Sequence, residues 1–180
     1  MTSYDTAPIA GGNLPAGITL CDCAFMSWGW WSGDIKYTNP AFRPGQSDKL
    51  NMATFVTGTL SNAVNMPLTG TATYTGHAFG NVSNGANSYS AFGTYTNAWN
   101  FGQGKGQVQL GFDNRTYTGQ TALTAPGSVN FTGPIAGGDR SGSLSGSFFK
   151  SPTDPVAGQG GSFSVSGPNY KAGGGFVGKR

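Results

Sequence analysis

The sequence predicts an all-β protein: a soluble eight-stranded antiparallel up-and-down β-barrel with an N-terminal extension of one or two additional strands. Three observations predict it. Many runs alternate a small or apolar residue with a small polar one, which is the period of a strand with one face in a core. The chain has 31 glycines, 9% charged residues and no glutamate, a composition that disfavours helix. Aromatic residues reach 13%, enough for a core that disordered chains lack.

The chain length of 180 residues suits one structural domain. Residues 1–20 are rich in proline and glycine and are expected to form a linker or lead-in arm. Residues 21–66 are expected to supply N-terminal strands that pack on the barrel. Strand-like alternation occurs there at 21–34 and again at 52–60, with a loop rich in proline and glycine between them. Residues 67–180 are expected to form the barrel itself.

Eight strand candidates follow Leu68, separated by short turns that contain glycine or asparagine. Their approximate ranges are 69–79, 88–101, 105–113, 114–120, 127–133, 140–149, 160–167 and 171–178. Consecutive strands joined by tight turns form an antiparallel meander, because parallel strands need long crossover connections. Eight such strands can close into a barrel, which leaves no free edge.

The two faces of these strands differ in character. In the strand at 88–101, one face carries Tyr89, Ala91, Gly93, Tyr95, Trp99 and Phe101, together with Asn97. The opposite faces carry mainly serine, threonine, glutamine and asparagine, although Phe92 falls among them. A membrane-spanning barrel would need an apolar outer face, so the aromatic side chains are expected to point inward. Glycines on the inward faces, such as Gly106 and Gly146, are expected to make room for large side chains opposite them.

Cys21 and Cys23 are the only two cysteines of the chain. A disulfide between them requires a bend, because the Cα atoms of residues i and i+2 in an extended strand lie near ~6.8 Å apart, the largest separation that a disulfide usually spans. Free thiols and bonds to another part of a longer protein are the alternatives. A metal site completed by His77 is a further one, although it would supply three of the four ligands that zinc takes.

Trp28, Trp30 and Trp31 are the candidate binding residues, since three of the four tryptophans lie within four positions. They could form an aromatic platform for sugars or haem. Alternatively they bury their large rings by closing one end of the barrel. The sequence leaves both interpretations open.

The inventory of reactive side chains predicts no enzyme. A Ser/His/Asp arrangement would have to use the single histidine, His77, which is expected to be an exposed polar residue. No spacing of aspartates indicates a carboxylate pair, and no metal or cofactor is expected. The net charge of +3 comes from scattered residues, so no nucleic-acid partner is expected. No run approaches the ~18 to 20 apolar residues of a membrane helix, so no membrane span is expected.

Several motifs occur in a suggestive order: Pro67-Leu-Thr-Gly-Thr-Ala-Thr-Tyr-Thr-Gly76, a middle strand ending in Phe-Asp113, Asn130-Phe-Thr-Gly133, Gly146-Ser-Phe-Phe149, Gly161-Ser-Phe163 and Gly175-Phe-Val-Gly-Lys-Arg180. Over residues 67–180 the chain thereby resembles the β-barrel domain of transferrin-binding protein B. That barrel occurs in surface lipoproteins of Gram-negative bacteria and at the C-terminal ends of large bacterial surface proteins. The chain departs from the lipoprotein members in lacking a lipobox cysteine, and its Cys21 to Trp31 segment lies outside the barrel motifs.

The resemblance implies a non-catalytic, extracellular or cell-surface module of a larger bacterial surface protein. Such a module would bind or display a macromolecular partner, either a host or envelope protein or the rest of its parent protein. Transferrin binding itself does not carry over. The alternative function is a small-ligand carrier, with haem or a lipid held in the barrel lumen or by the tryptophan-rich segment. The bulk of the inward aromatic residues argues against a ligand in the lumen.

Overall fold

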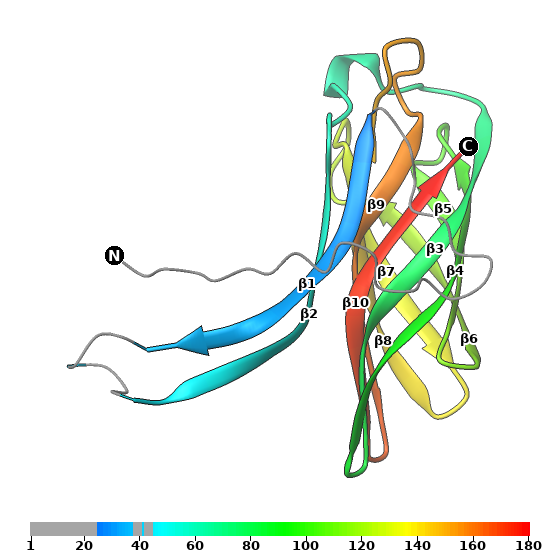
Figure 1. Ribbon diagram of the computed structural model, residues 1–180. Coiled ribbons are helices and arrows are strands. Elements are labelled where there is room, and N and C mark those ends of the chain that lie inside the picture. The colour runs from blue at the N-terminus through cyan, green and yellow to red at the C-terminus, as the bar shows by residue number, and fades with distance from the viewer. Residues whose placement is uncertain (1–24, 38–40, 42–44) are drawn as a thin grey trace.

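Eight strands close into a barrel in the computed structural model, which describes residues 25–37, 41 and 45–180 (Figure 1). The strands are β3 (Thr71–Asn84), β4 (Asn87–Asn100), β5 (Lys105–Phe112), β6 (Arg115–Leu123), β7 (Asn130–Gly137), β8 (Arg140–Phe149), β9 (Gly158–Gly167) and β10 (Tyr170–Lys179). Each pairs antiparallel with the next, and β10 returns to pair with β3. The eight-stranded antiparallel up-and-down barrel expected from the sequence is confirmed.

The lumen of the barrel is filled by apolar side chains, to which every barrel strand contributes. Phe148 lies at the centre of a group of rings. Its ring centroid is 5.0 Å from that of Trp99 and 5.4 Å from that of Phe131. Edge-on and tilted contacts at these distances are the preferred geometry of aromatic pairs. The expectation that aromatic side chains point inward is therefore correct for most of them.

Two inward-facing glycines lie where the lumen is most crowded. A Cβ atom on Gly106 would overlap the side chains of Asn97 and Trp99. A Cβ atom on Gly146 would come within 2.8 Å of the rings of Phe131 and Phe176. Glycine at these positions leaves space for large neighbours, as the alternation of the strands predicts.

A small polar cluster lies within the apolar lumen. The hydroxyl of Tyr95 donates to Oε1 of Gln159 at 2.6 Å, and Nδ2 of Asn97 donates to the same oxygen at 3.1 Å. All three side chains are fully buried. The inward position of Asn97 within an apolar strand face is thus explained by Gln159, a partner 62 residues further along the chain.

Tyr89 is an exception to the inward arrangement, since 40% of its surface is exposed. The hairpin of β3 and β4 is longer than its neighbours, and β4 pairs with β5 only from Gly93 onward. Tyr89 therefore lies beyond the rim of the barrel, where no lumen remains to bury it. The hairpin turns at Gly85, whose φ of 60° suits a tight turn. Strand β3 therefore extends to Asn84, beyond the end expected at residue 79.

Strands β1 (Met26–Lys36) and β2 (Ser47–Gly58) form a separate antiparallel hairpin. This agrees with the extension of one or two strands expected from the sequence. One end of the hairpin lies against the outer wall of the barrel and the other projects away from it (Figure 1). A short 3-10 turn, η1 (Ala63–Asn65), connects β2 to β3. In the described part of the chain, no helix is long and apolar enough to span a membrane.

Candidate functional site

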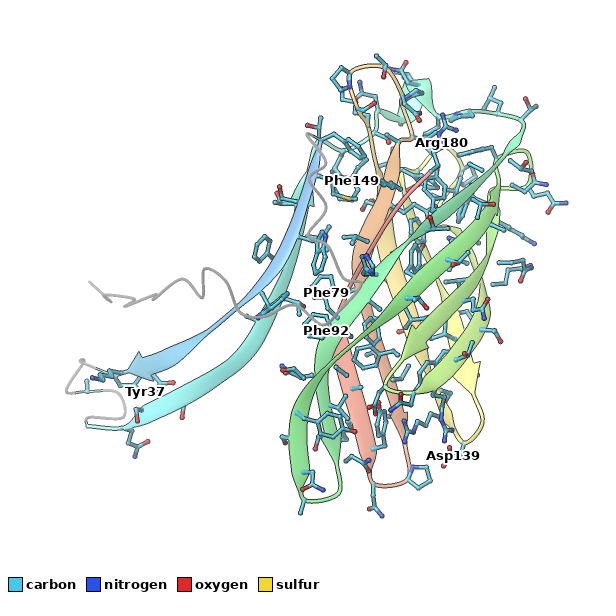
Figure 2. All side chains as sticks on the ribbon, turned by 45° about the vertical axis from the view of Figure 1, so that its right-hand side comes forward. Tyr37, Phe79, Phe92, Asp139, Phe149 and Arg180 are labelled. Carbon is cyan, nitrogen blue, oxygen red and sulfur yellow. The ribbon has the colours of Figure 1, made fainter. Side chains whose placement is uncertain are left out.

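The hairpin is held on the barrel by an aromatic interface. Met26, Trp28 and Trp30 alternate along β1, so their side chains share the face that looks toward the barrel. The ring of Trp28 lies 4.4 Å from that of Phe79 on β3, measured between centroids, and 5% of Trp28 is exposed. Trp30 meets Phe92 on β4 edge-on at 5.2 Å. Figure 2 shows Phe79 and Phe92 on the wall of the barrel that faces the hairpin.

The structure therefore places two of the three candidate tryptophans. Trp28 and Trp30 pack on the outer wall, and the interpretation that they close one end of the barrel is wrong for both. Phe79, Phe149 and Val177 supply an apolar patch on that wall, which the alternation of the strands did not lead us to expect. Trp31 lies next in β1, opposite Ala53 on β2.

The other candidate residues have different outcomes. Cys21 and Cys23 lie outside the described residues, so the predicted disulfide and its alternatives stay predictions. His77 lies on the outer face of β3, half-buried, with its ring centroid 6.2 Å from that of Trp28. It is thus partly covered by the hairpin rather than fully exposed.

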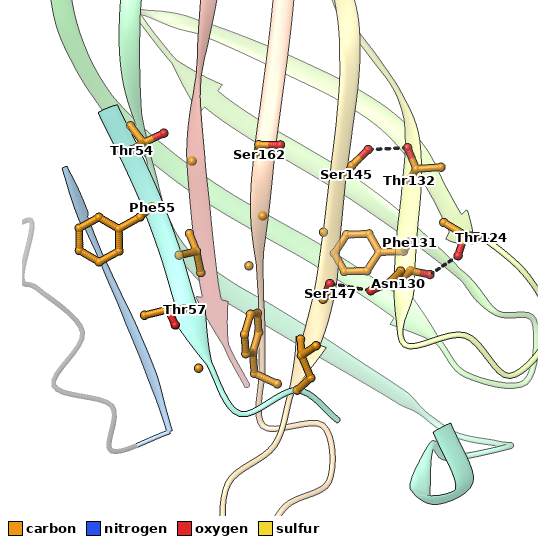
Figure 3. Close-up of a pocket in the computed structure, with 18 residues that line it drawn as sticks. Thr54, Phe55, Thr57, Thr124, Asn130, Phe131, Thr132, Ser145, Ser147 and Ser162 are labelled. Carbon is orange, nitrogen blue, oxygen red and sulfur yellow. Dashed lines mark hydrogen bonds between the residues drawn. The ribbon is translucent and has the colours of Figure 1, made fainter. Parts of the chain in front are cut away.

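A groove of about 720 Å³ lies between β2 and the outer wall of the barrel (Figure 3). One side is formed by the segment of β2 from Thr54 to Gly58. The floor is formed by the outward faces of β8 and β9, where Ser145, Ser147, Gly160 and Ser162 lie. Strand β1 is on the far side of β2, so the edge of β2 opposite to β1 borders the groove.

The walls of the groove are uncharged: none of its lining residues is Asp, Glu, Lys, Arg or His. Several polar side chains of the groove bond to each other. The hydroxyl groups of Thr132 and Ser145 share a hydrogen bond of 2.9 Å, and Ser147 donates to Oδ1 of Asn130 at 2.7 Å. Leu60 adds apolar surface at the β2 side and is 49% exposed, whereas the ring of Phe55 lies over Gly29 of β1, away from the floor (Figure 3). Such a surface suits a neutral partner that is partly apolar.

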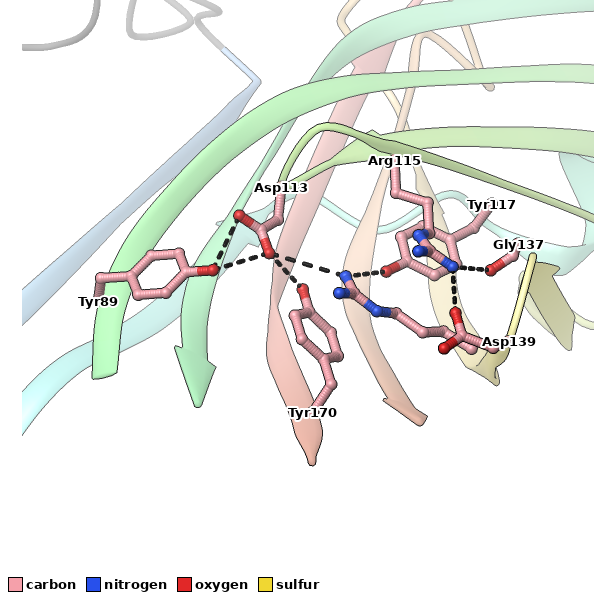
Figure 4. Close-up of polar contacts among 8 residues, drawn as sticks. Tyr89, Asp113, Arg115, Tyr117, Gly137, Asp139 and Tyr170 are labelled. Atoms are coloured by element: carbon pink, nitrogen blue, oxygen red, sulfur yellow. Dashed lines mark hydrogen bonds and ion pairs between the residues drawn. The ribbon is translucent and has the colours of Figure 1, made fainter. Parts of the chain in front are cut away.

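A second polar cluster lies at the end of the barrel that carries Asp139, away from the end that carries Phe149 and Arg180 (Figures 2 and 4). The carboxylate of Asp113 accepts hydrogen bonds from Tyr89 at 3.0 Å and from Tyr170 at 2.9 Å. Burial, followed by the hydrogen bond to Asp113, raises the pKa of Tyr170 above its usual 10. Beside them, Arg115 bonds to Asp139 and holds the pKa of that carboxyl below its usual 3.8.

The sequence analysis did not predict this cluster, although the turn residues of the sequence offered a signal for it. Asp113 and Asn114 form the turn between β5 and β6 with φ of 51° and 57°, a conformation that aspartate and asparagine adopt more readily than most residues. The partners come from three other strands, so the cluster could not be assembled from spacing alone. It is internally paired and joins strand ends, which indicates a stabilising role.

Side chains that could ligate a metal ion are scattered among the described residues. Three or more His, Cys, Asp or Glu side chains do not converge anywhere in that part of the chain as they would around a metal ion. In the second cluster, the carboxylate of Asp113 pairs with tyrosine and that of Asp139 with arginine. The groove beside β2 is accordingly the candidate functional site, as a surface for binding.

Solved structures with the same fold include transferrin-binding proteins. A crystal structure of a variant of the vaccine antigen transferrin-binding protein B from Haemophilus parasuis superimposes with a TM-score of 0.63 at 17% identity, covering 88% of this chain and 34% of that one. The intact transferrin-binding protein Ap-TbpB, with N and C lobes, gives 0.58 at 18% identity, covering 88% and 34%. A surface lipoprotein gives 0.60 at 15% identity, covering 87% and 76%.

This chain spans about a third of the length of the transferrin-binding proteins that it matches. No family model matches the sequence, and no curated protein does. At these identities the likeness is one of fold. The resemblance to the barrel of transferrin-binding protein B, suggested by the glycine-rich motifs, is confirmed at that level.

Proposed function

We propose that this chain is a non-catalytic β-barrel module of a larger bacterial surface protein, exposed at the cell surface or secreted, that binds a macromolecular partner. The observation that carries the proposal is the fold, which is shared with transferrin-binding protein B and with a surface lipoprotein. Host or envelope proteins are the class of partner that we infer. Transferrin is named for the similar proteins and is not assigned to this chain.

The filled lumen supports binding on the outer wall. Trp99, Phe131 and Phe148 occupy the space in which a barrel carrier would hold haem or a lipid. The groove beside β2 is open and uncharged by comparison. A ligand of the size of a protein segment is therefore better accommodated outside the barrel than inside it.

The proposal includes the organisation of the chain. We infer a lead-in arm over residues 1–20, strands that pack on the barrel over 21–66, and the barrel over 67–180. Strands β1 and β2 fall within the second segment and β3 to β10 within the third, which supports these boundaries. The backbone bridge between Leu60 and Phe149 joins the two segments, so we expect them to fold as one domain.

Capture of a partner tests the proposal. The full chain is immobilised and exposed to host serum and to bacterial envelope extracts, and a captured protein is then titrated with purified material. We expect saturable binding at micromolar concentration or below. No saturable partner from either source would contradict the function. A haem titration runs in parallel, and a shift of the Soret band would favour the carrier function instead.

A further inference from the structure

The edge of β2 that borders the groove has unpaired backbone groups. Within the described residues, β2 pairs along one side only, with β1. The amide of Thr59 donates to the carbonyl of Phe25 at 3.1 Å, which makes this a hydrogen-bonded pair of the ladder. Because such pairs alternate in an antiparallel ladder, the N–H and C=O groups of Thr54, Val56 and Gly58 point away from β1. They point to the groove side of the strand.

The same chain segment already pairs with the barrel where the groove ends. The amide of Lys150 donates to the carbonyl of Thr59 at 2.9 Å, and the amide of Ser61 donates to the carbonyl of Phe148 at 2.9 Å. Beyond this bridge β2 diverges from β8, and the groove opens between them. These two hydrogen bonds hold the chain just after β2 at the end of β8, beside one end of the groove.

From Ala53 to Gly58 the edge lacks the features that usually protect an exposed strand, because the one register shift of the ladder lies before this stretch, between Leu50 and Ala53. From Asn51 to Leu60 there is no charged residue and no proline, while threonine, valine and phenylalanine favour extended structure. Proteins commonly protect such edges with lysine, proline or a bulge. An edge without these features is suited to pairing with another chain.

The groove fits one strand rather than a second copy of this protein. Its open floor includes small residues, Ser145, Ser147 and Ser162, over which another strand could lie beside β2 at the usual ~4.8 Å spacing. Past the floor, the barrel wall continues to Asn130 and Thr132. If two copies paired through β2, their barrels would clash, because each barrel extends past the edge of its own β2. The lining has no charge to match a charged segment.

We propose that the groove binds an extended, uncharged peptide segment of a partner protein, which adds as a strand to the free edge of β2. The inference rests on the proposed function and names the mode of binding at the same site. Affinity would come from backbone hydrogen bonds, and selectivity from alternate side chains that contact the floor. Leu60 would contribute an apolar contact at the side of the groove.

The test uses synthetic heptapeptides that alternate threonine with valine or serine with isoleucine, with both ends blocked. Binding to the full chain is followed by the amide NMR signals of β2 and by titration. Two further versions of each peptide carry backbone N-methyl groups at alternate residues. One version is methylated at the odd-numbered residues and the other at the even-numbered residues. Since only one edge of the added strand faces β2, we expect one version to lose binding by about tenfold and the other to retain it.

Variants of the protein give a second readout. Thr54→Pro removes a backbone N–H that points to the groove, whereas Thr54→Ala also changes the side chain but keeps that N–H. Ser145→Lys places a charge on the floor. Ser143→Lys is its matched control, on the same face of β8 but outside the groove. We expect Thr54→Pro to weaken peptide binding about tenfold more than Thr54→Ala does, and Ser145→Lys to weaken it by about tenfold, whereas Ser143→Lys should change it by less than about twofold.

Several outcomes would overturn the inference. Peptide binding that tolerates both patterns of N-methylation would exclude strand addition, as would equal effects of Ser145→Lys and Ser143→Lys. Dimerisation of the chain that Thr54→Pro abolishes would assign the edge to a second copy. If no peptide binds while the captured protein still does, the edge is not the site and the proposed function stands. If the captured protein is also absent, the function itself fails.

Discussion

The phenolic oxygen of Tyr170 lies 2.9 Å from Oδ2 of Asp113, which joins the start of the last barrel strand to the turn between β5 and β6. Tyr89 donates to the same carboxylate, and the guanidinium of Arg140 lies 3.8 Å from it and 3.3 Å above the centre of the Tyr170 ring. Strands β4, β8 and β10 therefore meet at one carboxylate, whose side chain is 12% exposed. Figure 4 shows this convergence.

Replacing Asp113 with asparagine should destabilise the barrel. The substitution keeps a residue that tolerates a φ of 51° and removes the charge that two phenols and Arg140 share. Hydrogen bonds to charged groups contribute about 1.5 to 3 kcal/mol, so we expect Asp113→Asn to lower the free energy of unfolding by about 2 kcal/mol. Urea denaturation measures it. Asp139→Asn alters an exposed ion pair and serves as the control, so equal losses in both variants would contradict the role given to Asp113.

Stability should fall at alkaline pH. Burial raises the pKa of Tyr95 and of Tyr170 above the usual 10. A phenol that ionises less readily in the folded protein contributes its full stability below pH 10. That contribution declines as the pH rises further, because the unfolded chain releases its protons first. Each such phenol adds a slope of up to about 1.4 kcal/mol per pH unit. Urea denaturation between pH 8 and about 11.5 measures the slope.

The variant Tyr95→Phe tests the assignment of that slope. It removes one buried phenol, so the decline above pH 10 should become shallower, whatever the variant loses in stability at neutral pH. An unchanged slope would show that Tyr95 does not contribute to it. Constant stability of the original protein above pH 10 would contradict the whole prediction.

Adding a methyl group at Gly106 should be costly. Its Cβ would overlap Asn97 and Trp99, which are both buried in the lumen. Overpacking of a filled core costs about 1 to 3 kcal/mol, so we expect Gly106→Ala to lower the unfolding free energy by about 2 kcal/mol. Gly173→Ala is the matched control, since the nearest atom to its Cβ would be the carbonyl oxygen of Phe163 at an ordinary 3.4 Å. A thermal or urea midpoint distinguishes them, and equal shifts would contradict the crowding argument.

Truncating Trp28 should loosen the hairpin and leave the barrel intact. Trp28 is largely buried against Phe79, and removing a buried aromatic side chain costs about 3 to 5 kcal/mol. We expect Trp28→Ala to speed amide hydrogen exchange in β1 and β2 by about 100-fold, with little change in the strands of the lumen. Trp30→Ala should act in the same direction but more weakly, because Trp30 is half-buried. Unchanged exchange in the hairpin would contradict the anchoring role of Trp28.

The barrel could be predicted because its signals are local. In β5, Gly106, Val108, Leu110 and Phe112 point inward while Gln107 and Gln109 point outward, and neighbouring strands repeat this pattern. Strand ends were predicted less well. β3 continues to Asn84 and β7 to Gly137, because a ladder extends as far as its partner strand allows, which the local composition does not report.

The candidate site could be predicted only in part. Strand-like alternation at 21–34 was predicted, and within it Met26, Trp28 and Trp30 share the face of β1 that packs on the barrel. Their partners could not be predicted, because Phe79 and Val177 lie far away in sequence. Phe92 offered a signal, as an aromatic residue on an otherwise polar face that pairs with Trp30.

The amino-acid sequence alone predicts an all-β chain with eight consecutive barrel strands, an inward set of aromatic residues and a short N-terminal extension. These follow from side-chain alternation and turn residues, which act over a few positions along the chain. The position of the hairpin on the outer wall, the groove beside the free edge of β2 and the convergence of three strands on Asp113 become visible only in the folded protein. Both depend on closure and coiling of the barrel, which bring together residues that no local pattern relates.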